Sequence, residues 1–291
     1  MIEIVRPGPL TTVQDLGRPG YASLGVSPSG AADRGSMRLA NRLVGNAESA
    51  AVLETTCGGL AARFHAPATV AICGAPTAVA VDGRACTMNG PVAVAAGQVL
   101  SLGFPSAALR GYLAVRGGID IPPVLGSRST DTLSGIGLAP LTAGARLRVG
   151  DAALRFPPVD FAPVRGFGDA AVLRVVLGPR DDWFTPHALA TLCAATYSVT
   201  PDSNRVGARL TGPVLARAVE RELPSEAVVR GAIQVPPSGE PVIFLADHPV
   251  TGGYPVIAVV HDADLDRAAQ LRPGDTARFR PWSPSIDSHR W

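Results

Sequence analysis

The sequence predicts a mainly β protein with a few short helices. Short runs of aliphatic and β-branched residues recur at intervals of about 8–12 residues with turn residues between them, which is typical of barrels and sandwiches. The 291 residues include 32 glycines and 27 prolines, enough to supply many tight turns. Hydrophobic residues make up 46% of the chain and charged residues 17%, so the chain can bury a large core.

The first clear strand signal is a hairpin. Residues 77–81 form an apolar run, Asp82-Gly83 follows, and Arg84-Ala85 begins the return strand. Asp-Gly tolerates the positive φ angles of a type I′ turn, which predicts a two-residue hairpin. Other strands are expected at 92–94, 99–102, 112–115, 147–149, 172–177, 232–235, 242–245, 256–260 and 277–279.

Three segments favour helices. Residues 32–44 place Met37, Ala40 and Val44 on one face, and Gly45 suits the position after a helix end. Thr185 followed by Pro186 predicts an N-cap and the first helical residue. A third, short helix is expected after Asp262, with Asp262 as its cap.

The chain is long enough for two modest domains. Residues 156–168 are rich in proline and apolar residues, and we take them as the boundary. We therefore predict an N-terminal β domain at 1–158, a C-terminal β domain at 168–282 and a loose tail at 283–291. Similar Gly-plus-polar segments before the strands at 99 and 277 hint that the two domains are related barrels.

Charge and composition exclude several classes of function. The net charge is +2 and all 26 basic residues are arginine, so nothing favours a nucleic-acid or membrane partner. Without lysine, the chain can carry neither a Schiff-base nor a phosphate-loop lysine. Its four cysteines are scattered and its first residues lack a basic, apolar leader, which favours a reducing cytoplasmic location.

No metal site is expected. The five histidines are scattered, and the acidic run at 262–266 lacks the glycine and glutamate that a calcium loop requires. The cysteines form no C-x-x-C pair, which argues against a zinc site.

The first candidate site is the segment from 11 to 20. Strand alternation places Thr12 and Gln14 on one face, and Asp15 and Arg18 follow beside glycines. A catalytic carboxylate with a polarising amide is one interpretation. A strand end with a turn held by an Asp15–Arg18 pair is the other, and composition alone favours it.

The second candidate is the segment 200–210. Arg205 and Arg209, helped by Ser203 and Asn204, are predicted to hold a carboxylate or phosphate through charge-assisted hydrogen bonds. If the strand begins at Val206, both arginines lie on one face. A polar turn before an edge strand is an equally good interpretation.

The third candidate is the segment 247–255. Backbone N–H groups near Gly252 and Gly253 can hold an anion, with Asp247 as a possible base and Tyr254 as a donor. A plain Gly-Gly turn is the alternative. The remaining candidate contacts are Thr251 from this segment and Gln234 from the end of a nearby strand.

Motifs in both halves of the sequence give it a family resemblance. Residues 12–21 read TVQDLGRPGY, and the signature continues at 29–33, 40–46, 53–56, 112–119, 126–130, 203–212, 231–236 and 251–255. The chain resembles the biotin-dependent carboxyltransferase-like family, also called the allophanate hydrolase subunit 2 or KipA family. Three positions depart from the family pattern: Arg180 replaces a common Gln, Val206 a Met and Val250 a Thr.

The resemblance implies tandem cyclophilin-like β-barrel domains and a function. Members of this length resemble the C subunit of an ATP-dependent 5-oxoprolinase, which opens 5-oxo-L-proline to L-glutamate with subunits A and B. It implies ATP shared with those partners and inactivity of the isolated chain. Two alternatives stay open: a carboxyltransferase that uses a biotinylated carrier and urea, or a non-catalytic regulator that binds a KipI-like protein.

The implied chemistry assigns roles to the candidate residues. Arg205 and Arg209 would hold the substrate carboxylate or a phosphate. The N–H groups of Gly252 and Gly253, with Gln14 and Gln234, would polarise the amide carbonyl. Asp247 or Asp15 would move protons. Because the chain has no lysine, we expect it to share its site with a partner rather than act as a complete ATPase.

Overall fold

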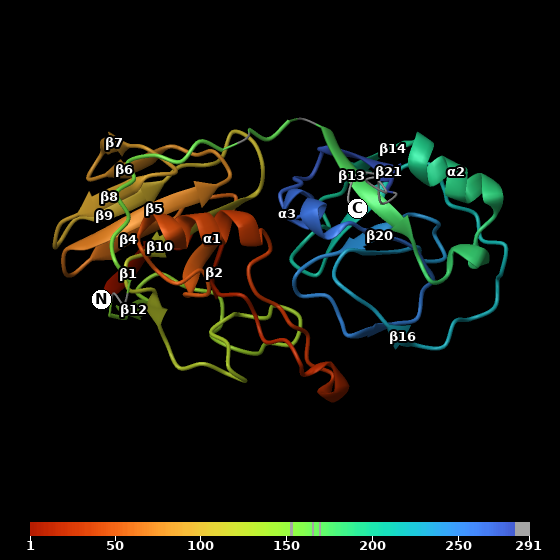
Figure 1. The fold of residues 1–291 in the computed structure, drawn as a ribbon, viewed down its shortest axis with the longest axis horizontal. Coiled ribbons are helices and arrows are strands. Elements are labelled where there is room, and N and C mark those ends of the chain that lie inside the picture. Colours follow the sequence, from red (N-terminus) through yellow and green to blue (C-terminus); the bar gives the residue numbers. More distant parts are fainter. Residues whose placement is uncertain (152–153, 165, 169, 283–291) are drawn as a thin grey trace, which may run out of the picture. The chain divides into compact units, whose positions relative to one another are not determined.

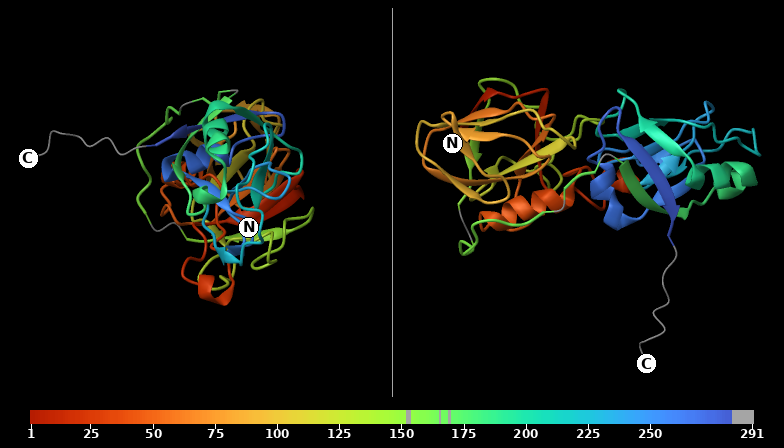
Figure 2. Two further views of the ribbon diagram at one scale, coloured as in Figure 1. Left: turned by 90° about the vertical axis from the view of Figure 1, so that its right-hand side faces the viewer. Right: turned by 90° about the horizontal axis from the view of Figure 1, so that it is seen from above.

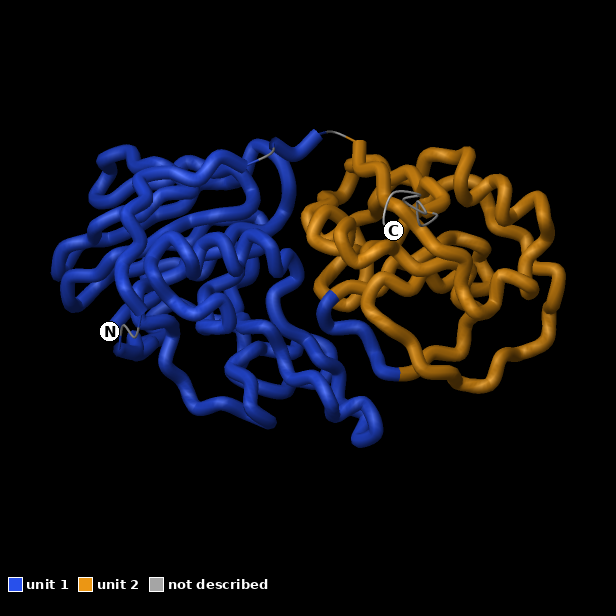
Figure 3. Tube along the Cα trace, in the orientation of Figure 1, with its two compact units in different colours: residues 1–169, 246–250 blue, residues 170–245, 251–291 orange. Residues whose placement is uncertain are grey.

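A computed structural model describes residues 1–151, 154–164, 166–168 and 170–282. The chain divides into two compact units (Figure 3). Unit 1 comprises residues 1–169 and 246–250, and unit 2 comprises residues 170–245 and 251–291. Residues 246–250 therefore belong to unit 1, although the residues on both sides of them in the sequence belong to unit 2. The expected tail at 283–291 lies outside the described residues.

Two sheets and one helix form unit 1 (Figure 1). One sheet has seven strands in the order β11-β12-β1-β4-β9-β6-β7, and the other has five in the order β2-β3-β10-β5-β8. The strand bounds are β1 Ile2–Arg6, β2 Leu10–Gln14, β3 Val52–Thr56, β4 Ala61–Phe64, β5 Ala68–Gly74, β6 Val79–Val81, β7 Arg84–Cys86, β8 Pro91–Val94, β9 Val99–Leu102, β10 Arg110–Val115, β11 Ile119–Asp120 and β12 Arg146–Val149.

The β6–β7 hairpin has the predicted turn. Asp82 has φ +46° and Gly83 has φ +78°, which is the pair of positive angles that a type I′ turn requires. Val79 pairs with Cys86 and Val81 with Arg84. The Asp-Gly dipeptide therefore fixes the register of this hairpin.

The core of unit 1 lies between the two sheets. Buried side chains from both sheets form one apolar cluster, with Ile4 and Leu100 from one sheet and Ile72 and Leu113 from the other. Helix α1, Arg34–Leu43, covers the outer face of the five-stranded sheet against β5 and β10 (Figure 2). Its side-chain cap is Asp33, which accepts a hydrogen bond from the Ser36 N–H at 2.9 Å.

A closed seven-stranded barrel forms unit 2, in the order β13-β20-β17-β18-β15-β14-β21. β13 and β21 pair in parallel and the other barrel neighbours are antiparallel. The strand bounds are β13 Ala170–Leu177, β14 Thr196–Val199, β15 Gly207–Thr211, β16 Glu226–Ala227, β17 Ala232–Gln234, β18 Val242–Phe244, β19 Thr251–Gly252, β20 Val256–Val260 and β21 Thr276–Pro281. β16 and β19 form a separate two-stranded ribbon.

The remaining elements are short helices. Helix α2 is Pro186–Ala194 and α3 is Leu265–Ala268, and 3-10 turns lie at Ala22–Leu24, Asp181–Trp183 and Asp262–Asp264. The Thr185 cap is confirmed, because its Oγ1 accepts from the Ala188 N–H at 3.1 Å. The Asp262 cap is wrong: Asp262 starts the 3-10 turn, and His261 caps it by accepting from the Ala263 N–H.

These observations confirm the predicted fold class, mainly β with few helices; unit 2 forms a closed barrel, whereas the strands of unit 1 form two sheets. Within the described part of the chain, no helix has the length and apolar character needed to cross a membrane.

Candidate functional site

Buried polar side chains gather in unit 1 where β2 ends. Thr12 and Gln14 share one face of this strand, as alternation predicts, and the Gln14 amide donates to Thr12 Oγ1 at 3.0 Å. The same amide nitrogen donates to the Thr130 carbonyl at 2.9 Å. On the opposite face of β2, Val13 packs into the apolar core. The strand thus separates a polar side from the core.

Asp15 follows the strand and receives four hydrogen bonds. Its Oδ1 accepts from Gly17 N–H at 2.8 Å, Ser127 Oγ at 2.6 Å and Ser129 Oγ at 2.5 Å, and its Oδ2 accepts from Arg128 N–H at 2.6 Å. This carboxylate therefore ties the 15–17 turn to a loop more than a hundred residues later in the chain.

Arg18 is only 1% exposed, yet its guanidinium does not pair with Asp15 as the turn interpretation requires. It donates instead to the carbonyls of Ser129 and Val124. Burial lowers the pKa of Arg18 below its ordinary value, and nearby carboxylates, Asp131 first, act in the opposite direction. The ion-pair interpretation is therefore wrong: Nε and Nη2 donate to neutral carbonyl groups, and Asp15 acts on the guanidinium only through its charge.

Two atoms of this cluster are buried without a hydrogen-bond partner among the described residues. They are Arg18 Nη1, a donor, and Gln14 Oε1, an acceptor. Buried polar atoms of this kind ordinarily find a partner. The cluster therefore retains one donor and one acceptor that a water or an amide-bearing ligand could satisfy.

Asp247 enters unit 1 from the segment 246–250 and is fully buried. Its Oδ1 accepts from Ser29 Oγ at 2.6 Å, and its Oδ2 accepts from Thr132 N–H at 2.9 Å and Thr132 Oγ1 at 2.7 Å. Ser29 has φ +52°, a conformation that costs free energy in a non-glycine residue. The fold therefore accepts local strain where this hydroxyl meets the carboxylate.

Sequence reasoning missed the hydroxyl residues of this cluster as site residues. Ser29, Ser127, Ser129 and Thr132 all donate to one of the two carboxylates. A usable signal existed: residues 127–132 carry four hydroxyls and an aspartate within six positions, with no apolar residue. Such density is typical of loops that bind polar groups through side chains.

A second buried network lies beside the first half of α1. The Tyr112 hydroxyl donates to Glu54 Oε2 at 2.9 Å and accepts from the Asp33 N–H at 2.7 Å. Glu54 Oε2 also accepts from the Ala32 N–H. Burial, with the Glu54 and Asp33 charges, raises the pKa of Tyr112 well above its ordinary value. This network holds the entry to α1 and keeps the phenol neutral.

In unit 2, the structure brings Gln234 and the Thr251–Tyr254 segment together. The buried Gln234 amide donates to the Tyr254 carbonyl at 2.9 Å. A Cβ at Gly252 would lie 2.4 Å from Gln234 Nε2, so a larger residue there would require the Gln234 amide to move. Tyr254 itself is 45% exposed. The predicted association of Gln234 with the Gly-Gly segment is therefore present.

The two arginines of the second candidate segment, 200–210, differ in burial. Arg205 is 1% exposed, whereas Arg209 is exposed. The predicted common face is wrong because β15 begins at Gly207 rather than Val206. Ser203 Oγ accepts from the Arg209 N–H at 3.0 Å, and Asn204 Oδ1 accepts from the Val206 N–H at 2.8 Å. These two side chains therefore shape the turn before β15.

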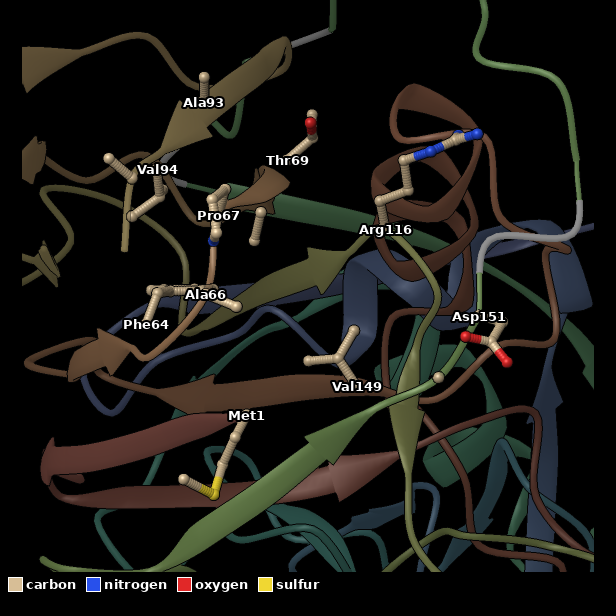
Figure 4. Close-up of a pocket in the computed structure, with 13 residues that line it drawn as sticks. Met1, Phe64, Ala66, Pro67, Thr69, Ala93, Val94, Arg116, Val149 and Asp151 are labelled. Atoms are coloured by element: carbon tan, nitrogen blue, oxygen red, sulfur yellow. The ribbon is translucent and has the colours of Figure 1, made fainter. Parts of the chain in front are cut away.

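A pocket of about 710 Å³ lies elsewhere in unit 1 (Figure 4). Its lining is mostly apolar and includes Met1, Phe64 and Val149, with Arg116 and Asp151 among its polar groups. Both terminal nitrogens of Arg116 already donate to the carbonyls of Val44 and Leu154. No candidate site residue lines this pocket, so it is separate from the polar cluster. The described residues contain no group of three or more His, Cys, Asp or Glu arranged to hold a metal ion.

Comparison with known proteins decides the family. Residues 24–281 match the family described as "Carboxyltransferase domain, subdomain A and B". The chain belongs to this carboxyltransferase-domain family. The motifs at 29–33, 112–119 and 251–255 that carried the resemblance all lie within the matched range.

Relatives of this carboxyltransferase-domain chain fall into two groups. It is 37% identical over 282 residues to the C subunit of 5-oxoprolinase from Escherichia coli, covering 96% of this chain and 90% of the relative. It is 36% identical to the "Urea amidolyase" of Lachancea kluyveri, covering 98% of this chain but 17% of that protein. The crystal structure of the K. lactis urea amidolyase superposes with a TM-score of 0.90 and 33% identity, covering 97% of this chain and 19% of that one.

The carboxyltransferase-domain cluster in unit 1 is chemically suited to an uncharged amide. It combines fixed carboxylates, a buried guanidinium and an amide side chain, with hydroxyl groups between them. Fixed dipoles and donors inside a dry site stabilise developing charge more strongly than water does. Such a set can orient a carbonyl compound and move protons, and it contains no strong nucleophile.

Proposed function

We propose that this chain is the C subunit of an ATP-dependent 5-oxoprolinase, which opens 5-oxo-L-proline to L-glutamate together with subunits A and B. One observation carries the proposal: separate proteins that bear the name of the 5-oxoprolinase C subunit, from E. coli and Haemophilus influenzae, match at 37% and 34% identity over 90% of their length. The match covers 96% of this chain and 90% of each of these relatives.

The proposed chemistry requires activation of a lactam. ATP would phosphorylate the lactam oxygen and leave as ADP. Water would then add to the activated carbon, inorganic phosphate would leave, and the C–N bond would break as the nitrogen takes up a proton, which releases glutamate. Because the chain has no lysine, we assign ATP binding to a site shared with the partner subunits. We also assign the complex to the cytoplasm, a proposal that the four free cysteines support.

The candidate residues of the two units differ in kind. In unit 2, the buried Arg205 is the better candidate for holding the substrate carboxylate or a phosphate, because Arg209 faces solvent. In unit 1, Asp247 is the better candidate for proton transfer. Both carboxylates meet two hydroxyls, which can accept and pass on a proton. Asp15 is also engaged by two backbone N–H groups in closing the 15–17 turn, whereas Asp247 is engaged by one.

A carboxyltransferase function is the second candidate. The family name and the urea amidolyase relatives favour it, and it would require biotin on a separate carrier, since this chain has no lysine to be biotinylated. The chain spans 17% of those relatives. Their activity on urea is therefore a weaker guide to this chain than the full-length agreement with the 5-oxoprolinase relatives.

A reconstitution assay separates the candidates. The chain is mixed with the proteins encoded beside it, and glutamate release is measured with ATP and 5-oxo-L-proline, then with urea in its place. Our proposal predicts glutamate release only with all subunits and ATP. Turnover of urea that depends on a biotinylated carrier and bicarbonate would establish the carboxyltransferase. Tight partner binding without either reaction would establish a regulator instead.

A further inference from the structure

An ion pair in unit 2 holds a strap segment, which we define as residues 221–228. Arg180 Nε donates to Glu226 Oε2 at 2.9 Å, and Arg180 Nη2 donates to Glu226 Oε1. A two-point contact of this kind fixes orientation as well as distance. The Arg180 side chain is 35% exposed and the Glu226 side chain 30% exposed, so the pair lies at the surface of the barrel.

The backbone of Arg180 is itself fixed. Its N–H donates to the Val256 carbonyl at 3.2 Å, and the N–H of Gly178 donates to the Ile257 carbonyl at 2.9 Å. Val256 begins β20 directly after the Thr251–Pro255 segment. The backbone that carries the Arg180 side chain is therefore hydrogen-bonded to β20, the strand that follows the Gly-Gly segment.

Glu226 connects to the same segment from the other side. It lies on β16, where it pairs with Gly252 of β19, while Ala227 pairs with Thr251. Gln234 closes the arrangement by donating to the Tyr254 carbonyl. Residues 251–254 are thus held at three places: by the ribbon to β16, by the Gln234 amide and by the start of β20.

The rest of the strap is held by weaker contacts. The Arg221 guanidinium lies 5.4 Å from the centre of the Trp183 ring, Leu223 packs at the edge of the barrel core, and Val228 joins a small apolar cluster with Val256. β16 has only two residues and a single partner strand. A two-residue ribbon has little stability of its own, so even the small contribution of a partly exposed ion pair can affect its position.

We propose that the Arg180–Glu226 pair is a positioning clasp: it fixes the strap so that the ribbon holds Thr251–Tyr254 in the geometry needed for turnover. The clasp touches no reacting atom. Its role in turnover rests on the proposed function, whereas its role in ordering residues 251–254 does not. The pair is a bidentate ion pair, so charge and planar shape both matter.

Hydrogen exchange on the free chain tests the ordering role. In the Arg180→Ala variant, amides of 223–228 and 251–254 should exchange about two- to fivefold faster, the range expected for a partly exposed ion pair. The matched control is Arg174→Ala, which breaks the bidentate Arg174–Asp264 pair in the same unit. That variant should leave exchange at 251–254 unchanged. Equal exchange in wild type and Arg180→Ala would overturn the proposal.

Kinetics with the reconstituted complex test the role in turnover. Arg180→Ala should lower kcat about tenfold or more with KM nearly unchanged, because small misplacement of a site costs much rate, while the melting temperature stays close to that of wild type. The swapped double variant Arg180→Glu/Glu226→Arg should restore both exchange and kcat, and Arg180→Lys should restore them in part. If the double variant restores neither the exchange rates nor kcat, the proposal that this ion pair positions residues 251–254 is wrong. If the wild-type complex is inactive, the proposed function fails and the exchange data still decide the ordering role.

Discussion

The polar cluster of unit 1 and the ribbon of unit 2 are stabilised in opposite ways. In unit 1, Asp15 and Asp247 are held by serine and threonine hydroxyls and backbone N–H groups. In unit 2, the Thr251–Tyr254 segment is largely exposed and depends on a partly exposed ion pair and one glutamine. Both regions contain residues that the sequence marks as candidates for chemistry.

This difference has a physical consequence. A buried carboxylate cannot lose its donors without a large cost in free energy, so the unit 1 cluster is expected to keep one arrangement. A surface ion pair contributes little to stability, so the ribbon can shift at small cost. We therefore expect changes in unit 1 to reduce stability and changes near the ribbon to reduce turnover first.

The largest expected effect is in unit 1. Asp247→Ala should lower the free energy of unfolding by about 3 kcal/mol, because the Ser29 and Thr132 donors lose a buried charged acceptor. Urea denaturation followed by circular dichroism measures this change. The exposed Asp262→Ala is the matched control and should behave like wild type. Equal midpoints for the two variants would show that the cluster is not the rigid part of the molecule.

The next prediction separates two arginines of unit 2. Arg205→Ala should lower kcat/KM about 10- to 150-fold, which corresponds to the loss of one charge-assisted contact. Arg209→Ala should change it less than about twofold, because this side chain faces solvent. Steady-state kinetics of glutamate release by the full complex provide the measurement. A similar loss in both variants would contradict the assignment of Arg205 alone.

A smaller effect is expected at Tyr112. Tyr112→Phe should cost about 1–2 kcal/mol of stability, since Glu54 and the Asp33 N–H each lose a partner. The raised pKa of Tyr112 makes the wild type sensitive to alkali: its contribution is complete below about pH 10, the ordinary tyrosine value, and is lost as the pH rises through the higher folded value.

Unfolding measured between about pH 8 and 12, a range that spans the ordinary tyrosine value, checks this prediction. The difference in stability between wild type and Tyr112→Phe should shrink at the alkaline end. Tyr21→Phe, at a half-buried tyrosine outside the Glu54 network, serves as the control for loss of a tyrosine hydroxyl. A constant difference across the range would mean that the phenol ionises normally.

The sequence predicts local features well because nearby residues decide them. The Asp82-Gly83 turn, the Thr185 cap and the shared face of Thr12 and Gln14 all depend on a few neighbouring positions. Failures come where distant residues decide the outcome. The serine partners of Asp15 lie more than a hundred positions away, so the proximity of Arg18 in sequence suggests a pair that does not form.

Position 180 shows the same limit. From the sequence alone, Arg180 is a departure from the family pattern with no assigned partner. In the structure, its charge is taken up by Glu226, 46 residues later in the chain. The expectation that Arg205 and Arg209 share a face assumes that the strand begins at Val206. β15 begins at Gly207, and Arg205 is buried whereas Arg209 is exposed.

The most direct test of the account is the turnover of an Asp247→Asn complex. Asparagine keeps the size of the side chain but removes its charge and its ability to take up a proton. Because the variant also loses the charged acceptor of Ser29 and Thr132, turnover is compared under conditions in which the complex is fully assembled. If the chain contributes chemistry and not only binding, glutamate release from 5-oxo-L-proline and ATP by the assembled complex should fall about 100-fold or more, the typical contribution of a general base. Full glutamate release by an assembled Asp247→Asn complex would contradict the central claim that the buried carboxylate of this chain takes part in opening the lactam.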